Sequence, residues 1–175
     1  IREWIKHWLY EQLPSARCFE NPCNNLGFAR QLILEKANNR FLYFIDPDIE
    51  VISNSIQKLI QVANTHITSS ENRPFIGFGG TIILRSNNSY LNQTFKRLMS
   101  ISRLIPYSFQ IQNHTHLLAV DHLPTCHLLL DTKAALNVGG FSHLYERCGE
   151  DLDFTHRSYN LNFRFLFLPN ASVLH

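Results

Sequence analysis

Hydrophobic residues recur along the chain at two spacings, one typical of helices and one typical of strands. Residues 1–13 show the helical spacing, which Pro14 ends. Further helices are expected over residues 25–37 (with Asn24 or Asn25 as cap), 53–65 (with Ser53 as cap), 90–105, 131–138 and 150–159. Strands are expected over residues 15–20, 41–46, 75–84, 117–122 and 163–168. This alternation predicts an α/β fold with a mainly parallel sheet flanked by helices.

The strand expected at residues 41–46 (FLYFID) is almost entirely hydrophobic, and it ends in two carboxylates, Asp46 and Asp48. Pro47 lies between them and cannot donate to a ladder, so the strand is expected to stop there. In an extended segment both carboxylates point to the same side, where they repel each other unless a cation lies between them. Such oxygen ligands suit Mg²⁺ or Mn²⁺. The alternative is an ordinary polar turn in which Asp48 caps the next segment.

A second acidic group opens the last expected helix, where Glu150, Asp151 and Asp153 follow Gly149. Acidic residues favour the first turn of a helix, so stabilisation of the helix end is one explanation. Three acids within four residues exceed what a cap needs, and a site is the other explanation. His175 is one of nine histidines, none of which shows a zinc-ligand spacing such as H-E-x-x-H. Taken alone, it is more typical of an ordinary residue than of a ligand.

Composition narrows the classes of protein to consider. A chain of 175 residues with 45% hydrophobic content can bury the core of a single domain spanning 1–175. The net charge of +2 gives no electrostatic reason to expect nucleic acid as a partner. Four cysteines without C-x-x-C or zinc spacing favour free thiols, and hence a cytoplasmic location or the cytoplasmic face of a membrane. Four Asn-x-Ser/Thr sites leave secretion open as an alternative.

The order of the motifs resembles that of the inverting nucleotide-sugar glycosyltransferases of family 2, which have the GT-A fold. The resemblance covers roughly residues 15–175 and includes the D-x-D motif at Asp46 and Asp48. The other matching stretches are Asn25–Gln31 (NLGFARQ), Val138–Phe141 (VGGF), Gly149–Phe154 (GEDLDF) and Pro169 to His175. Each motif is weak alone, but five in the family's order form a specific pattern.

On the donor side, the resemblance implies a site for Mn²⁺ or Mg²⁺ and a nucleoside-diphosphate sugar, with uracil as the family's usual base. Asp48 would bind the metal directly, Asp46 would contact the metal or the nucleotide-sugar, and His175 would complete the metal site. The residues that would lie against the nucleotide-sugar are Asn25, Gly27, Arg30 and Asp46.

On the acceptor side, the resemblance implies a glycan or lipid-linked hydroxyl acceptor, as in polysaccharide biosynthesis. Asp151 would be the general base, and Glu150 and Gly140 would contact the acceptor. The transferred sugar would be a hexose or an N-acetylhexosamine.

The chain departs from the family at its beginning. The family's fold starts with two strands, which carry a Pro-x-x-Asn-like loop and an Asp that contacts the base, and neither precedes Ile1. The chain is therefore expected to be N-terminally incomplete, and alone it would be inactive or would need the missing segment as a partner.

Two alternative functions remain at this point. A catalytically silent carbohydrate- or protein-binding domain could share the fold, and a metal-dependent nucleotidyltransferase could share the D-x-D motif. Residues 94–105 combine apolar and basic positions, which fits either a helix covering the sheet or peripheral contact with an anionic membrane.

Overall fold

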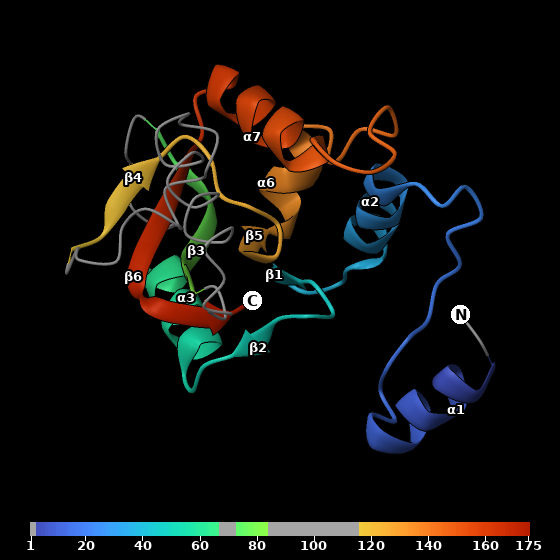
Figure 1. Cartoon of the computed structure of the whole chain (residues 1–175). Helices are drawn as coiled ribbons and strands as arrows, with labels where there is room; N and C mark the ends of the chain where they lie inside the picture. The colour runs from blue at the N-terminus through green and yellow to red at the C-terminus, as the bar shows by residue number, and fades with distance from the viewer. Residues whose placement is uncertain (1–2, 67–72, 84–115) are drawn as a thin grey trace, which may run out of the picture.

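The computed structural model describes residues 3–66, 73–83 and 116–175, which form a sheet with helices on both faces (Figure 1). The helices are α1 (Glu3–Gln12), α2 (Leu26–Lys36), α3 (Ser55–His66), α6 (Thr132–Asn137) and α7 (Glu150–Asn160). The strands are β1 (Phe41–Ile45), β2 (Glu50–Val51), β3 (Phe75–Ile83), β4 (Leu118–Val120), β5 (His127–Asp131) and β6 (Arg164–Leu174).

The described strands form one sheet in the order β1-β5-β3-β6-β2, and β4 also pairs with β6. Among the described strands only β3 and β6 pair in parallel, while the β1–β5, β3–β5, β4–β6 and β2–β6 pairs are antiparallel. The expectation of a mainly parallel sheet is therefore wrong for this part of the chain. The cause is β5, which lies between β1 and β3 and runs against both. The strands β1, β3 and β6 still share one direction.

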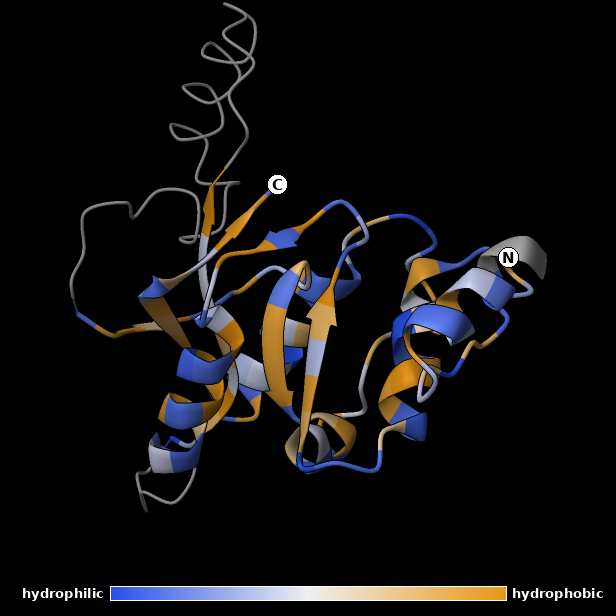
Figure 2. Ribbon diagram, turned by 90° about the horizontal axis from the view of Figure 1, so that it is seen from below, coloured by the Kyte–Doolittle hydropathy of each residue, from blue (hydrophilic) through white to orange (hydrophobic). Residues whose placement is uncertain are grey.

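Side chains alternate between two hydrophobic layers, one on each face of the sheet. Along β6, Phe165 and Phe167 face one layer, and Leu166 and Leu168 face the other. The first layer is completed by α2, α6 and α7, and the second by α3. The strands are largely hydrophobic, whereas the helices mix hydrophobic and polar positions (Figure 2). This explains why β6 reads as a continuous apolar run, because both of its faces are covered.

Most of the expected elements are confirmed within the described ranges. Asn25 caps α2 by accepting a hydrogen bond from the amide of Phe28, and Asp131 caps α6 by accepting one from Ala134. The expected strand at residues 15–20 is wrong, since this stretch has no regular structure. Ser53 is not the cap of α3, which begins at Ser55. The helix expected at 90–105, which includes the basic segment 94–105, lies outside the described residues.

Helix α1 lies apart from the sheet, and an extended segment joins it to α2 (Figure 1). Its side chains of Trp8 and Tyr10 are exposed, as is Leu13 just after it. None of the helices in the described ranges has the length and apolar character needed to cross a membrane.

Candidate functional site

The end of β6 brings His175 to Asp48. The pairing of β6 with β3 shifts register where Gly80 faces Leu168 and Thr81 faces Ser172, so β6 bulges there and then continues. Beyond the bulge β6 pairs with β2, with Glu50 opposite Leu174. Continuing this antiparallel register places His175 opposite Ile49, next to Asp48. From the sequence this strand is expected to end at residue 168. Its continuation to Leu174 is what brings His175 to Asp48.

Asp48 and His175 form a hydrogen-bonded pair in which His175 Nε2 lies 3.2 Å from Asp48 Oδ2. Both side chains are accessible to solvent, with 67% of Asp48 and 38% of His175 exposed. A carboxylate oxygen and an imidazole nitrogen are both ligands for Mn²⁺, and a cation can replace the proton that now joins them. The pair thus fits the predicted metal role. No group of three or more such ligands occurs among the described residues.

Asp46, the other predicted metal residue, is joined to Arg30. The Arg30 guanidinium lies 3.2 Å from Asp46 Oδ1 and makes a second ion pair with Glu150. Arg30 is 10% exposed and Glu150 only 2%, and Glu150 Oε2 has no hydrogen-bond partner in the described structure. One buried cation therefore connects the D-x-D motif with the start of α7. Three residues predicted separately as donor, metal and acceptor contacts thus lie in one cluster.

Asp151 lies in the first turn of α7, which begins after Gly149 with its left-handed backbone (φ 95°). Its Oδ1 accepts a hydrogen bond from the amide of Leu152 at 2.8 Å. Asp153, by contrast, is bound to Arg157 through Oδ2, at 2.9 Å from Nε and 2.7 Å from the terminal nitrogen. The two carboxylates therefore differ: Asp153 is held in an ion pair, whereas Asp151 is partly buried and has no ion-pair partner among the described residues.

Asn25 and Gly27, predicted to contact the nucleotide-sugar, bind an internal loop in this structure. The Asn25 side-chain amide donates to the carbonyl of His143, and the Gly27 amide donates to that of Tyr145. A Cβ on Gly27 would collide with the backbone carbonyl of Ser142. Both residues therefore fix the loop at 142–146 against α2, and their contact with a nucleotide stays a prediction.

Gly140, predicted to contact the acceptor, also has an internal role. Its φ is +62°, and a Cβ there would collide with the side-chain amide of Gln31. That amide oxygen accepts the backbone N–H of Phe141 at 2.8 Å, while Arg157 donates to the Gly140 carbonyl at 2.6 Å. The glycine is required by the backbone here, and its contact with an acceptor remains a prediction.

Sequence reasoning missed Cys126, whose thiol interacts electrostatically with Asp46, Asp151 and Arg30. Burial, and to a lesser extent the negative charges of Asp46 and Asp151, raise the pKa of its thiol to about 12 against the opposing charge of Arg30. The thiol is therefore protonated at neutral pH and is a poor nucleophile. No motif in the sequence marks Cys126, because its neighbours come from three distant segments.

Tyr43, His127 and Ala171 form a hydrogen-bonded network that joins β1, β5 and β6. Tyr43 on β1 bonds His127 Nδ1 at 2.7 Å, and His127 Nε2 lies 3.1 Å from the carbonyl of Ala171 in the β6 bulge. Because that carbonyl can only accept, Nε2 carries the proton and Nδ1 accepts from the tyrosine hydroxyl. Burial lowers the pKa of His127 to about 4 and raises that of Tyr43. This network links β1, which precedes the D-x-D motif, to β6, which precedes His175.

We expect His127 in this network to make the stability of the fold sensitive to acid. The folded pKa of His127 is about 4 against an ordinary value of 6.5 in the unfolded state, so the unfolded state binds more protons between these limits. Stability is full above pH 6.5 and falls by about 3 kcal/mol on going to pH 4. In His127→Gln this part of the loss should disappear. Urea unfolding of both proteins between pH 7 and 4 measures the difference, and equal acid slopes would contradict the assignment.

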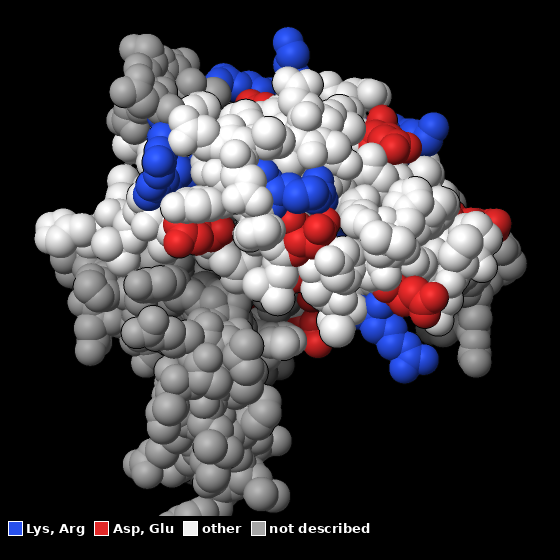
Figure 3. All heavy atoms as spheres, turned by 90° about the horizontal axis from the view of Figure 1, so that it is seen from above, with Lys and Arg blue, Asp and Glu red and all other residues white. Residues whose placement is uncertain are grey.

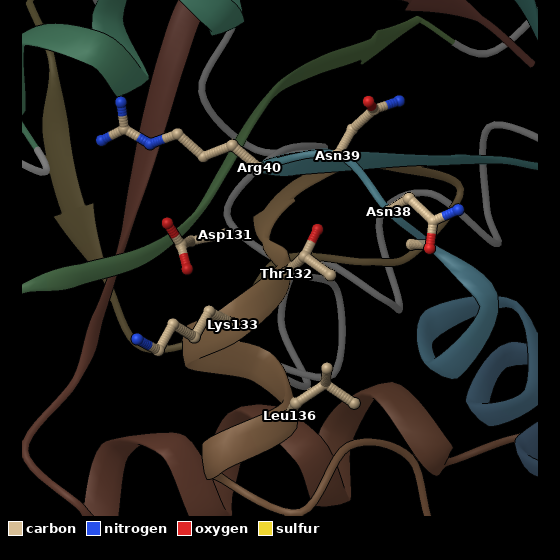
Figure 4. Close-up of a pocket in the computed structure, with 8 residues that line it drawn as sticks. Asn38, Asn39, Arg40, Asp131, Thr132, Lys133 and Leu136 are labelled. Atoms are coloured by element: carbon tan, nitrogen blue, oxygen red, sulfur yellow. The ribbon is translucent and has the colours of Figure 1, made fainter.

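A pocket of about 460 Å³ lies at the opposite end of β1 from the D-x-D motif (Figure 4). Its lining residues are Ala37, Asn38, Asn39, Arg40, Asp131, Thr132, Lys133 and Leu136. None of these is a predicted site residue.

On the face that Figure 3 shows, acidic and basic side chains lie next to one another rather than in separate patches.

Comparison with known proteins supports the fold. No family model and no curated protein matches the chain. Among solved structures, it is similar to a crystal structure of GalNAc-T7 with UDP, GalNAc and Mn²⁺, with a TM-score of 0.71 and 16% sequence identity. The match covers 99% of this chain but only 35% of that chain. The α/β expectation is confirmed in this form: the chain has a GT-A-like glycosyltransferase fold.

Proposed function

We propose that the chain carries out metal-dependent, inverting transfer of a sugar from a nucleoside-diphosphate sugar to a hydroxyl acceptor, as family 2 glycosyltransferases do. The observation that carries this proposal is the Asp48–His175 pair at the end of β1, 3.2 Å between Nε2 and Oδ2. Asp46, two residues before Asp48, is linked through Arg30 to Glu150 at the start of α7. The similar GalNAc-T7 structure contains UDP and Mn²⁺, which favours a UDP-sugar as donor and Mn²⁺ as the metal.

On the donor side, Asp48 and His175 would hold the cation and Asp46 would contact the cation or the diphosphate. A bound divalent cation supplies charge stabilisation for the leaving diphosphate. Arg30 keeps the Asp46 carboxylate in place and adds positive charge beside it. The three side chains come from the ends of β1 and β6, which share one direction, so the donor lies beyond their carboxyl ends.

On the acceptor side, Asp151 would act as the general base. The acceptor hydroxyl forms a bond to the anomeric carbon, its proton passes to the Asp151 carboxylate, and the bond to the diphosphate oxygen breaks with its electron pair. Asp151 suits this role because its carboxylate is partly accessible and has no ion-pair partner among the described residues. The acceptor would be a glycan or a lipid-linked hydroxyl.

The metal site gives the first functional prediction. Mn²⁺ together with UDP should stabilise the natural full-length protein, because a ligand at about 100 times its Kd adds about 2.7 kcal/mol to the folded state. Asp48→Asn should remove most of this gain, since it deletes one of the two paired ligands. Thermal unfolding with Mn²⁺, UDP, both and neither measures the effect. Glu50→Gln, two residues away on β2, is the control, and an equal loss in both variants would contradict the site.

The product of the reaction separates the classes of enzyme. Incubation with UDP-sugars and Mn²⁺ should release UDP, by transfer or by slow hydrolysis. Release of the sugar 1-phosphate, by transfer of the uridylyl group, would instead identify a nucleotidyltransferase.

A catalytically silent binding domain of the same fold is the second candidate. It is favoured by one observation, that no group of three metal-ligating side chains occurs in the described ranges. Binding of a UDP-sugar without release of UDP under any metal would support this second function.

A further inference from the structure

A histidine outside all predicted motifs contacts the helix that carries the proposed base. His122 lies in the loop between β4 and β5, and its Nδ1 is 2.9 Å from the hydroxyl of Thr155 on α7. Thr155 is only 2% exposed, so this contact is made inside the protein. Thr155 follows Asp151 by four residues, which places both side chains on the same face of the helix.

The protons in this contact can be assigned from its partners. The Thr155 hydroxyl donates to the carbonyl of Leu152 at 3.1 Å, so its oxygen can only accept from His122. His122 therefore carries its proton on Nδ1. The amide of Leu152 in turn donates to Asp151 Oδ1 at 2.8 Å. Hydrogen bonds through Thr155 and the backbone of Leu152 thus tie the His122 ring to the first turn of α7, where Asp151 lies.

We propose that His122 is a positioning residue for sugar transfer, which fixes the first turn of α7 and with it the direction of the Asp151 carboxylate. This inference rests on the proposed function of Asp151 as the base. Burial lowers the pKa of His122, and the charge of Asp151 opposes this, which agrees with a neutral ring that lies near the carboxylate. His122 does not touch substrate in this role and acts only through Thr155.

The test compares two replacements of His122 in the natural full-length protein. Asn carries a side-chain N–H at the place of Nδ1 and can still donate to Thr155, whereas Leu cannot. His122→Leu should lower kcat about 10-fold to 100-fold, because small displacements of a catalytic group have effects of this size. Its KM for the UDP-sugar should change less than twofold. His122→Asn should recover most of the rate, and His156→Leu, at an exposed position of α7, should leave it unchanged.

A second measurement separates this proposal from the proposed function. Hydrogen exchange of the amides at 152–155 should be faster in His122→Leu than in the unmodified protein, and near normal in His122→Asn. If the unmodified protein transfers no sugar, the proposed function fails, and the exchange rates still decide whether His122 orders the turn. Unaltered kcat in His122→Leu, or an equal loss in the Asn variant, would overturn the positioning role.

Discussion

Replacing Asp151 with Asn in the full-length protein is expected to lower the rate of sugar transfer about 10²–10⁴-fold, the range typical for loss of a general base. The amide keeps the shape of the side chain, and its oxygen can still accept from the Leu152 amide. It cannot take the proton of the acceptor. Affinity for UDP and Mn²⁺ should change little, because the donor is assigned to Asp46, Asp48 and His175.

Asp153→Asn is the matched control for this prediction. It removes the same charge from the same helix turn, but its carboxylate is bound to Arg157, which also donates to the carbonyls of Val138 and Gly140. The control should therefore lower stability and leave transfer within a few-fold of normal. Initial transfer rates and UDP affinity are measured for both variants. Near-normal transfer by Asp151→Asn, or a loss of donor affinity in proportion to rate, would remove Asp151 as the base.

Replacing Arg30 with Met should have the largest effect on stability. The guanidinium is the ion-pair partner of Glu150, which is 2% exposed and has an oxygen without a hydrogen bond in the described structure. Removing one member of a buried pair leaves an uncompensated charge and costs about 3–5 kcal/mol. Urea unfolding at pH 7 measures this loss.

The double variant Arg30→Met with Glu150→Gln tests the cause. It removes the stranded carboxylate, so most of the lost stability should return. Arg30→Lys should lie between, since one ammonium cannot reach both Asp46 and Glu150 with the geometry of a guanidinium. If the double variant were no more stable than Arg30→Met, burial of an unpaired charge would not be the reason for the loss.

The sequence predicts the end of β1 at the D-x-D motif well, because it follows from local rules. A hydrophobic strand stopped by proline ends next to Asp46, with Asp48 in the turn that follows, and Asn25 caps its helix as expected. These signals need only a few adjacent residues. Motif order supplies the likeness to a GT-A fold, which the similar solved structure confirms.

The sequence predicts β5 and the length of β6 poorly, since both depend on distant partners. His127 is a polar residue inside β5, and only Tyr43 and Ala171 explain how it is buried. Pro169 suggests an end to β6, but it lies in a bulge after which pairing resumes. The Arg30–Glu150 pair and the contact of His122 with Thr155 join segments that no local pattern relates.

The central claim is that a metal and a nucleoside diphosphate bind at the ends of β1 and β6. Its most direct test is the anomalous scattering of Mn²⁺ in crystals of the full-length protein grown with UDP. The proposed function predicts a manganese peak beside Asp48 and His175, with UDP phosphate oxygens next to it. A peak elsewhere, such as the pocket at Asn38 and Lys133, or UDP bound away from Asp46, would contradict the proposed site.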